Sequence, residues 1–121
     1  NPAILDQFDK VIVLHNEYVT RTEFNAITQH PKVLYLHPNA LYAEINADYE
    51  NGTITLLRGH GYPDPQIANG FNWKFDNSEF EYKNCQDSWK FDKIDNGMML
   101  NCYPENIIYK NYTMLKMIKD Y

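Results

Sequence analysis

Two matching stretches decide the fold: Val11-Ile12-Val13-Leu14-His15-Asn16 and Val33-Leu34-Tyr35-Leu36-His37-Pro38. Each is a continuous apolar run, which is typical of a strand buried on both faces. Each run also ends in a histidine at the same register. A helical segment separates them, so the pair predicts a β-α-β unit with parallel neighbouring strands and a right-handed crossover.

The segment between the two runs has complete helix-start signals. Thr20 is a favourable N-cap, and Glu23 stands three residues later, as a capping box requires. Val19 and Phe24 occupy the two hydrophobic-staple positions. Pro31 then ends the helix, because a proline disfavours helical backbone in the residue before it.

Downstream of this unit the patterns favour antiparallel structure. Residues 42–49 and 53–57 flank Asn51-Gly52, a pair that favours a tight hairpin turn. Residues 59–70 carry three glycines and two prolines without periodicity, which predicts a loop. A loop of this length in a small domain is usually functional or covers something.

The last third is rich in aromatic residues. The tetrapeptide Trp-Lys-Phe-Asp occurs at 73–76 and again at 89–92, and its alternation of rings and charges predicts strands. Asn96-Gly97 predicts a second hairpin, in which counting outward pairs Ile94 with Met99 and Phe91 with Cys102. Residues 104–121 predict a closing helix with the apolar stripe Ile108, Tyr112, Leu115 and Ile118.

These elements predict an α/β or α+β fold: a short parallel β-α-β unit, antiparallel aromatic-rich hairpins and a C-terminal helix, in a single domain over residues 1–121. Residues 3–8 resemble the end of a helix, and in a doubly wound sheet a further strand normally precedes it. The chain also begins at Asn1 rather than Met. We therefore expect a fragment or processed part of a longer chain.

Cys85 and Cys102 are the only cysteines, and they lie on either side of a predicted hairpin. They predict one disulfide, which for this loop length contributes about 3 kcal/mol and implies an oxidising compartment. The alternative is two buried thiols in a cytosolic protein. Sequons at Asn51 and Asn111 also suggest a glycoprotein that is secreted or on the cell surface.

The charge pattern argues against two classes of partner. The net charge is −5, and the basic residues form no patch that would bind a nucleic-acid backbone. No apolar run is long enough to insert into a membrane.

The histidines that end the two runs form the first candidate site. Parallel strands bring His15 and His37 together at the carboxyl edge of the sheet, where open α/β sheets keep their ligands. His60 follows the strand of residues 53–57 and could reach the same edge, with Glu17 or Glu44 as a carboxylate. Such a set suits Zn²⁺ or Cu²⁺. The alternative is that each histidine only ends a strand and bonds to backbone carbonyls.

Aromatic residues form the second candidate site. Trp73, Trp89, Tyr82 and Phe75 could stack on the apolar faces of glycan rings. The alternative is that these rings fill the core between the sheet and the last helix, as large rings at period two usually do.

Catalytic motifs are lacking. Ser78 and Ser88 are the only serines, and neither lies in a Gly-x-Ser-x-Gly turn. The spacing of the acidic residues singles out no carboxylate pair for acid and base catalysis. We therefore interpret the chain as non-catalytic, with a hydrolase of glycans or peptides as a further alternative.

The segment from Val11 to Glu44 resembles uncharacterised extracytoplasmic α/β domains of archaeal surface and secreted proteins. The resemblance rests on His15-Asn16-Glu17-Tyr18-Val19-Thr20 and on Pro38-Asn39-Ala40-Leu41-Tyr42-Ala43-Glu44. Its opening also resembles the flavodoxin-like core of class I glutamine-amidotransferase-like proteins, whose catalytic cysteine has no counterpart here. The resemblance implies a non-catalytic binding or assembly module that contacts other domains of a parent protein or surface assembly.

Overall fold

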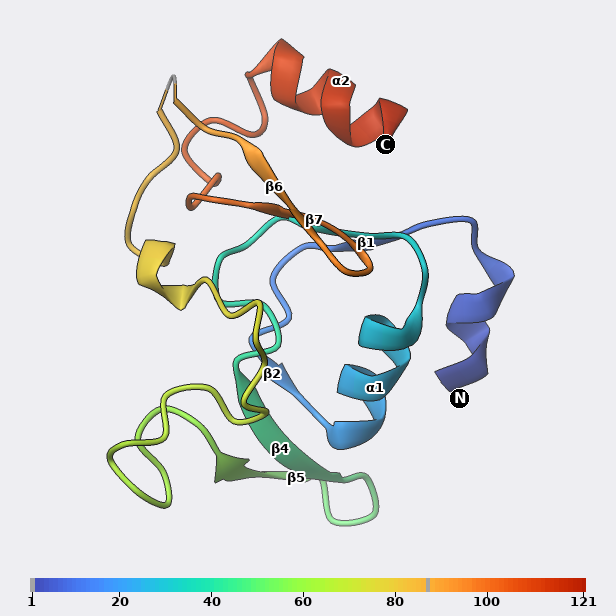
Figure 1. Cartoon of the computed structure of the whole chain (residues 1–121). Helices are drawn as coiled ribbons and strands as arrows, with labels where there is room; N and C mark the ends of the chain where they lie inside the picture. Colours follow the sequence, from blue (N-terminus) through green and yellow to red (C-terminus); the bar gives the residue numbers. More distant parts are fainter. Residues whose placement is uncertain (1, 87) are drawn as a thin grey trace.

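The structure is a computed structural model that describes residues 2–86 and 88–121, and within them two sheets and two α-helices form the fold (Figure 1). The strand order is β1-β3-β7-β6 in the first sheet and β2-β4-β5 in the second. The strands are β1 (Val11–Val13), β2 (Tyr18–Val19), β3 (Val33–Tyr35), β4 (Ala43–Asp48), β5 (Thr53–Arg58), β6 (Phe91–Ile94) and β7 (Gly97–Leu100). The helices are α1 (Arg21–Gln29) and α2 (Tyr112–Asp120), with 3-10 turns η1 (Pro2–Gln7) and η2 (Ser78–Phe80).

The predicted α/β organisation is confirmed, and its β-α-β unit is β1-α1-β3. Strands β1 and β3 pair in parallel, with Val13 opposite Tyr35. Thr20 caps α1 and forms both hydrogen bonds of the capping box with Glu23. The cap satisfies backbone N–H groups that the first turn of the helix leaves unpaired, so α1 begins where the sequence predicts.

The core lies on both faces of the first sheet. Ile27 of α1 packs with Val13, Tyr35 and Met99 on one face. Met114 of α2 packs with Leu100 and the two cysteines on the other face. Figure 1 shows the same layering, with α1 and α2 on opposite sides of the sheet. A disulfide joins Cys85 and Cys102, as predicted, with 4.9 Å between their Cα atoms.

The prediction that both runs are buried on both faces is right for β3 and wrong for β1. All three residues of β3 are buried. In contrast, Ile12 is 38% exposed and Leu14 is 63% exposed. The reason is position, because β1 is the edge strand of its sheet, whereas β3 lies between β1 and β7.

The first predicted hairpin is confirmed, since β4 and β5 pair antiparallel around the Asn51-Gly52 turn. Strand β2 was not predicted from the sequence. It is two residues long and pairs in parallel with β4, with Tyr18 opposite Ala43. A pair of this length has no periodicity to reveal it.

The second hairpin exists, but its predicted register is wrong. Phe91 pairs with Leu100, and Ile94 pairs with Gly97. Gly97 is therefore the first residue of β7 and not part of the turn. Its lack of a side chain is needed for packing, because it lies against the carbonyl group of Val33 in the neighbouring strand.

The prediction of a strand at residues 73–76 is wrong. Residues 73–82 contain turns and η2 and no strand. The side chain of Asn69 accepts hydrogen bonds from the backbone of Phe71 and Trp73, and Asp76 accepts one from Ser78. These local bonds compete with a sheet ladder.

The C-terminal helix begins later than predicted. Residues 105–110 form turns, and the side chain of Asn111 caps α2 by accepting a hydrogen bond from the backbone N–H of Met114. Met114 is fully buried, whereas Tyr112 is 78% exposed and Leu115 is 42% exposed. The cap therefore sets a helical phase in which two residues of the predicted stripe face solvent.

Candidate metal site at the ends of strands β1 and β3

His15 and His37 lie side by side, as the matching runs predict. The register of β1 and β3 places both histidines two residues beyond the pair Val13 and Tyr35. Their imidazole rings stack, with centroids 4.1 Å apart and planes 11° from parallel. Two metal-binding side chains thus meet at one edge of the sheet.

Glu105 completes the cluster. One ligand atom each from His15, His37 and Glu105 lies within 4.8 Å of the others. The sequence placed Glu105 in the first turn of a helix, so its role was missed. The one sequence feature that could indicate its position is that Glu105 follows Cys102 by three residues, because a disulfide restricts where the residues after it can lie.

Tyr103 positions Glu105 beside the histidines. Its hydroxyl donates a hydrogen bond to Glu105 Oε1 at 3.0 Å. Its ring meets the rings of His15 and His37 edge-on, at centroid distances of 6.0 and 4.8 Å. The backbone N–H of Cys85 donates to the Tyr103 carbonyl, so the disulfide region holds this segment in place.

Glu17 and His60, the other two predicted ligands, lie outside the cluster. His60 Nε2 is 2.7 Å from Glu17 Oε1, and His15 Nε2 is 3.8 Å from Glu17 Oε2. The ring of His60 stacks on Tyr18 and meets Tyr42 edge-on. Glu17 thus lies between the two histidines, where a carboxylate can orient His15 as an outer partner does at metal sites.

His37 differs from a histidine that serves only to end a strand. His30, which ends helix α1, has both ring nitrogens within hydrogen-bond distance of carbonyl oxygens, those of Lys32 and Phe8. His37 is 7% exposed, and its Nδ1 atom has no hydrogen-bond partner in the described parts of the chain. A buried polar atom of this kind needs a partner.

Burial lowers the pKa of His37 to about 4, with a further contribution from nearby His15 and an opposing one from Glu105. The imidazole is therefore neutral at physiological pH, which is the form that binds metal ions.

We expect the metal-free protein to lose stability in mild acid because of His37. The folded pKa of about 4 lies below the ordinary value of 6.5. Between these values the unfolded chain binds a proton that the folded chain does not, so the free energy of unfolding falls as the pH falls. The expected loss is about 2 kcal/mol between pH 7 and pH 5, measured by urea unfolding. A His37→Gln variant serves as the control, and an equally steep fall in that variant contradicts the assignment.

The ligand atoms are farther apart than the ligands of a bound zinc ion. Ligand atoms about 2.0–2.2 Å from a tetrahedral ion are about 3.3 Å from one another. In the structure the three ligand atoms lie within 4.8 Å of one another, and the stacked imidazole rings are nearly parallel. Binding therefore requires the rings to tilt so that their lone pairs converge. His15 is partly exposed and has room for this movement.

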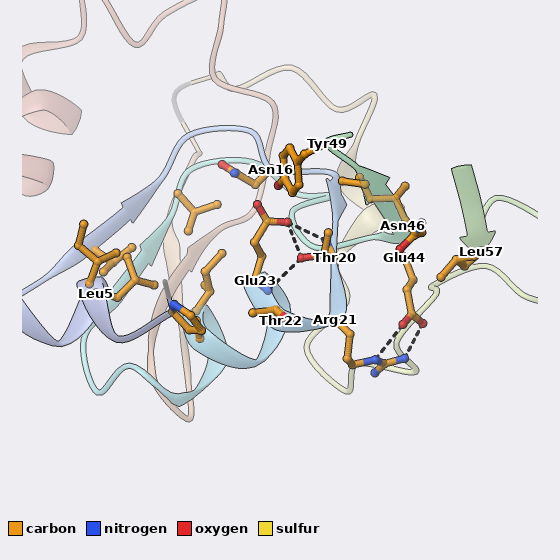
Figure 2. A pocket seen from close by; sticks show the side chains of 18 residues that line it. Leu5, Asn16, Thr20, Arg21, Thr22, Glu23, Glu44, Asn46, Tyr49 and Leu57 are labelled. Carbon is orange, nitrogen blue, oxygen red and sulfur yellow. Dashed lines mark hydrogen bonds and ion pairs between the residues drawn. The ribbon is translucent and has the colours of Figure 1, made fainter. Parts of the chain in front are cut away.

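A cavity of about 770 Å³ lies away from the histidine cluster, between α1, η1 and the second sheet (Figure 2). Figure 2 shows that its charged residues already have partners. Glu23 is bonded to Thr20, and Arg21 forms an ion pair with Glu44 at 2.5 Å. Among the described residues, no unpartnered buried polar atom belongs to its lining. This cavity therefore lacks the unpartnered buried atom found at the edge of the first sheet where His15 and His37 meet, which we call the histidine edge.

The proposed aromatic platform is not assembled. Trp73 packs into the core with Tyr35 and Phe24, whereas Trp89 packs on the other cluster beside Phe91. The prediction of a shared glycan-binding face is wrong for these two tryptophans, because they contribute to the cores on opposite faces of the first sheet.

The third predicted platform residue, Tyr82, is 89% exposed. It lines a small cavity beside His15. It also lines a second cavity, of about 350 Å³, together with Trp89, so Tyr82 adjoins both the histidines and one of the two tryptophans.

The two sequon asparagines both have local structural roles. The Asn51 amide donates to Asp48 Oδ2 at 2.8 Å in the exposed β4–β5 turn. Asn111 caps α2 through its side-chain oxygen. Glycosylation at either position remains a prediction.

No protein-family model, no curated protein and no solved structure matches this chain. Within residues 2–86 and 88–121, neither helix has the length and apolar character needed to cross a membrane. The functional argument therefore rests on the geometry of the site.

Proposed function

We propose that this domain binds one transition metal ion, Zn²⁺ or Cu²⁺, through His15, His37 and Glu105. The observation that carries the proposal is the convergence of three ligand atoms within 4.8 Å, from the end of β1, the end of β3 and the segment after the disulfide. Two imidazoles and a carboxylate, without a thiolate, suit these two ions.

The surroundings of the cluster support a cation. Glu17 lies beside His15, and Tyr103 orients Glu105. Outer partners that fix ligand orientation are a regular part of metal sites. The buried Nδ1 atom of His37 gives this histidine a nitrogen lone pair or N–H group that no residue within 2–86 and 88–121 uses.

We also propose that the domain works outside the cytoplasm, as a non-catalytic module of a larger secreted or surface protein. The disulfide between Cys85 and Cys102 supports this setting, because disulfides persist in oxidising compartments.

Zinc titration of the metal-free protein, purified without an affinity tag, tests the metal site. We expect one bound ion per chain, with affinity at least about 100-fold weaker in Glu105→Gln and His37→Ala. Glu105 is exposed, so its isosteric substitution separates loss of the ligand from loss of folding. Circular dichroism of each variant checks the fold.

His60→Ala is the matched control for this titration. His60 is the predicted ligand that the structure places outside the cluster, on Glu17. We expect its removal to weaken zinc binding far less than removal of His37. Equal losses in both variants, or full zinc binding by Glu105→Gln, would contradict the proposed ligand set.

A further inference from the structure

A cavity of about 370 Å³ adjoins the proposed metal site. It is lined by His15, Glu17, Asn39, Glu81, Tyr82, Asn84 and Tyr103. Among the three proposed ligands, His15 lines the cavity itself, and Tyr103, which also lines it, donates a hydrogen bond to Glu105. Its volume lies within the range of small-molecule sites, about 300–1,000 Å³.

Asn39 points to a ligand in this cavity. It is only 1% exposed, and its Oδ1 atom has no hydrogen-bond partner among residues 2–86 and 88–121. A buried acceptor left without a donor destabilises the folded state, so a native site usually has one. A ligand that brings a hydroxyl or N–H group would satisfy it.

The charged side chains that line the cavity are acidic and not basic. Glu17 and Glu81 both line it, and the described lining residues include no lysine or arginine. The pKa of Tyr82 is raised chiefly by its hydrogen bond to Glu81 and by the charge of that carboxylate. Away from the proposed ion, these carboxylates disfavour an anionic group and accept hydrogen bonds from hydroxyl groups.

The proposed ion already places a positive charge beside the cavity, which disfavours a second cation. A neutral ligand rich in hydroxyl groups fits the rest of the lining. Such a ligand donates to the oxygens of Asn39 and Glu81, and the rings of Tyr82 and Tyr103 offer apolar surface for its carbon skeleton. Three protein ligands also leave a tetrahedral ion one open position, which a hydroxyl oxygen can occupy.

We propose that the cavity lined by Asn39, Glu81 and Tyr82 binds a neutral sugar, with the ion held by His15, His37 and Glu105 as part of the binding site. This inference rests on the proposed metal function and adds a class of ligand to it. It also moves the glycan surface away from Trp73 and Trp89, which pack against the two cores.

An array of neutral, sialylated and sulfated glycans, probed with zinc-loaded and zinc-free protein, tests this inference. We expect binding to neutral glycans only, and only in the presence of zinc. The best neutral glycan is then titrated calorimetrically. We expect Tyr82→Ala to bind it about fivefold to tenfold more weakly, the effect of losing one stacked ring. Glu81→Gln is expected to weaken binding as well.

Tyr49→Ala is the matched control, because Tyr49 is 88% exposed and Tyr82 is 89% exposed. Tyr49 lines the larger cavity and not this one, so its loss should leave glycan binding unchanged. An equal effect of the two substitutions overturns the inference, as does a preference for sialylated or sulfated glycans. Glycan binding that is the same with and without zinc also overturns it.

Zinc titration of the same samples separates the two proposals. If the protein binds one zinc ion per chain but no glycan on the array, the sugar inference is overturned and the metal site is retained. Failure of the wild-type protein to bind zinc overturns the proposed function itself.

Discussion

Replacing Gly97 with alanine is expected to lower the free energy of unfolding by about 4 kcal/mol, because the new methyl group has no space. A Cβ atom at this position overlaps the carbonyl oxygen of Val33 and lies 2.8 Å from the hydroxyl oxygen of Tyr121. Gly97 and Val33 are paired between β7 and β3, in the interior of the first sheet. The methyl group also displaces the hydrogen bond that the Tyr121 hydroxyl donates to Val33, 3.0 Å long.

Urea unfolding of the wild type and the variant measures this loss. Gly52→Ala is the matched control, because a Cβ atom there meets nothing within 4 Å while φ is +64°. We expect the control to lose about 1 kcal/mol through its left-handed backbone alone. If Gly97→Ala loses no more than this control, the close contact between β7 and β3 is wrong.

Removing the disulfide is expected to have the second-largest effect. The double substitution Cys85→Ser with Cys102→Ser frees a loop with a sequence separation of 17 residues. We expect the free energy of unfolding to fall by about 3 kcal/mol and the melting temperature by roughly 10 °C. The cause is the added conformational freedom of the unfolded chain, together with loss of packing in the cluster around Met114.

The same double variant should also bind zinc more weakly. Glu105 follows Cys102 by three residues, and the backbone bond between Cys85 and Tyr103 holds that segment against the histidines. Reductant added to the wild type should reproduce both losses, and it should leave the double variant unchanged. Detection of two reactive thiols in the native wild type would contradict the bond and remove the support for an oxidising compartment.

Local sequence patterns predicted part of the histidine site but not all of it. The matching runs predicted parallel neighbours, and the shared register then required His15 and His37 to meet. Both steps follow from strand geometry and from the start signals of α1, which act over a few residues. Glu105 had no such signal. It reaches the site only because the disulfide and Tyr103 bring a distant segment of the chain against β1 and β3.

The sequence by itself determined the elements whose causes are local: the capped helix α1, the parallel pair β1 and β3, the hairpin of β4 and β5, and the cysteine pairing. Tertiary structure alone decided that Gly97 is a packing residue, that His60 is bound to Glu17, and that Trp73 and Trp89 lie in separate core clusters. The physical reason is that side-chain periodicity reports which face of an element is apolar. It does not report which distant segment covers that face.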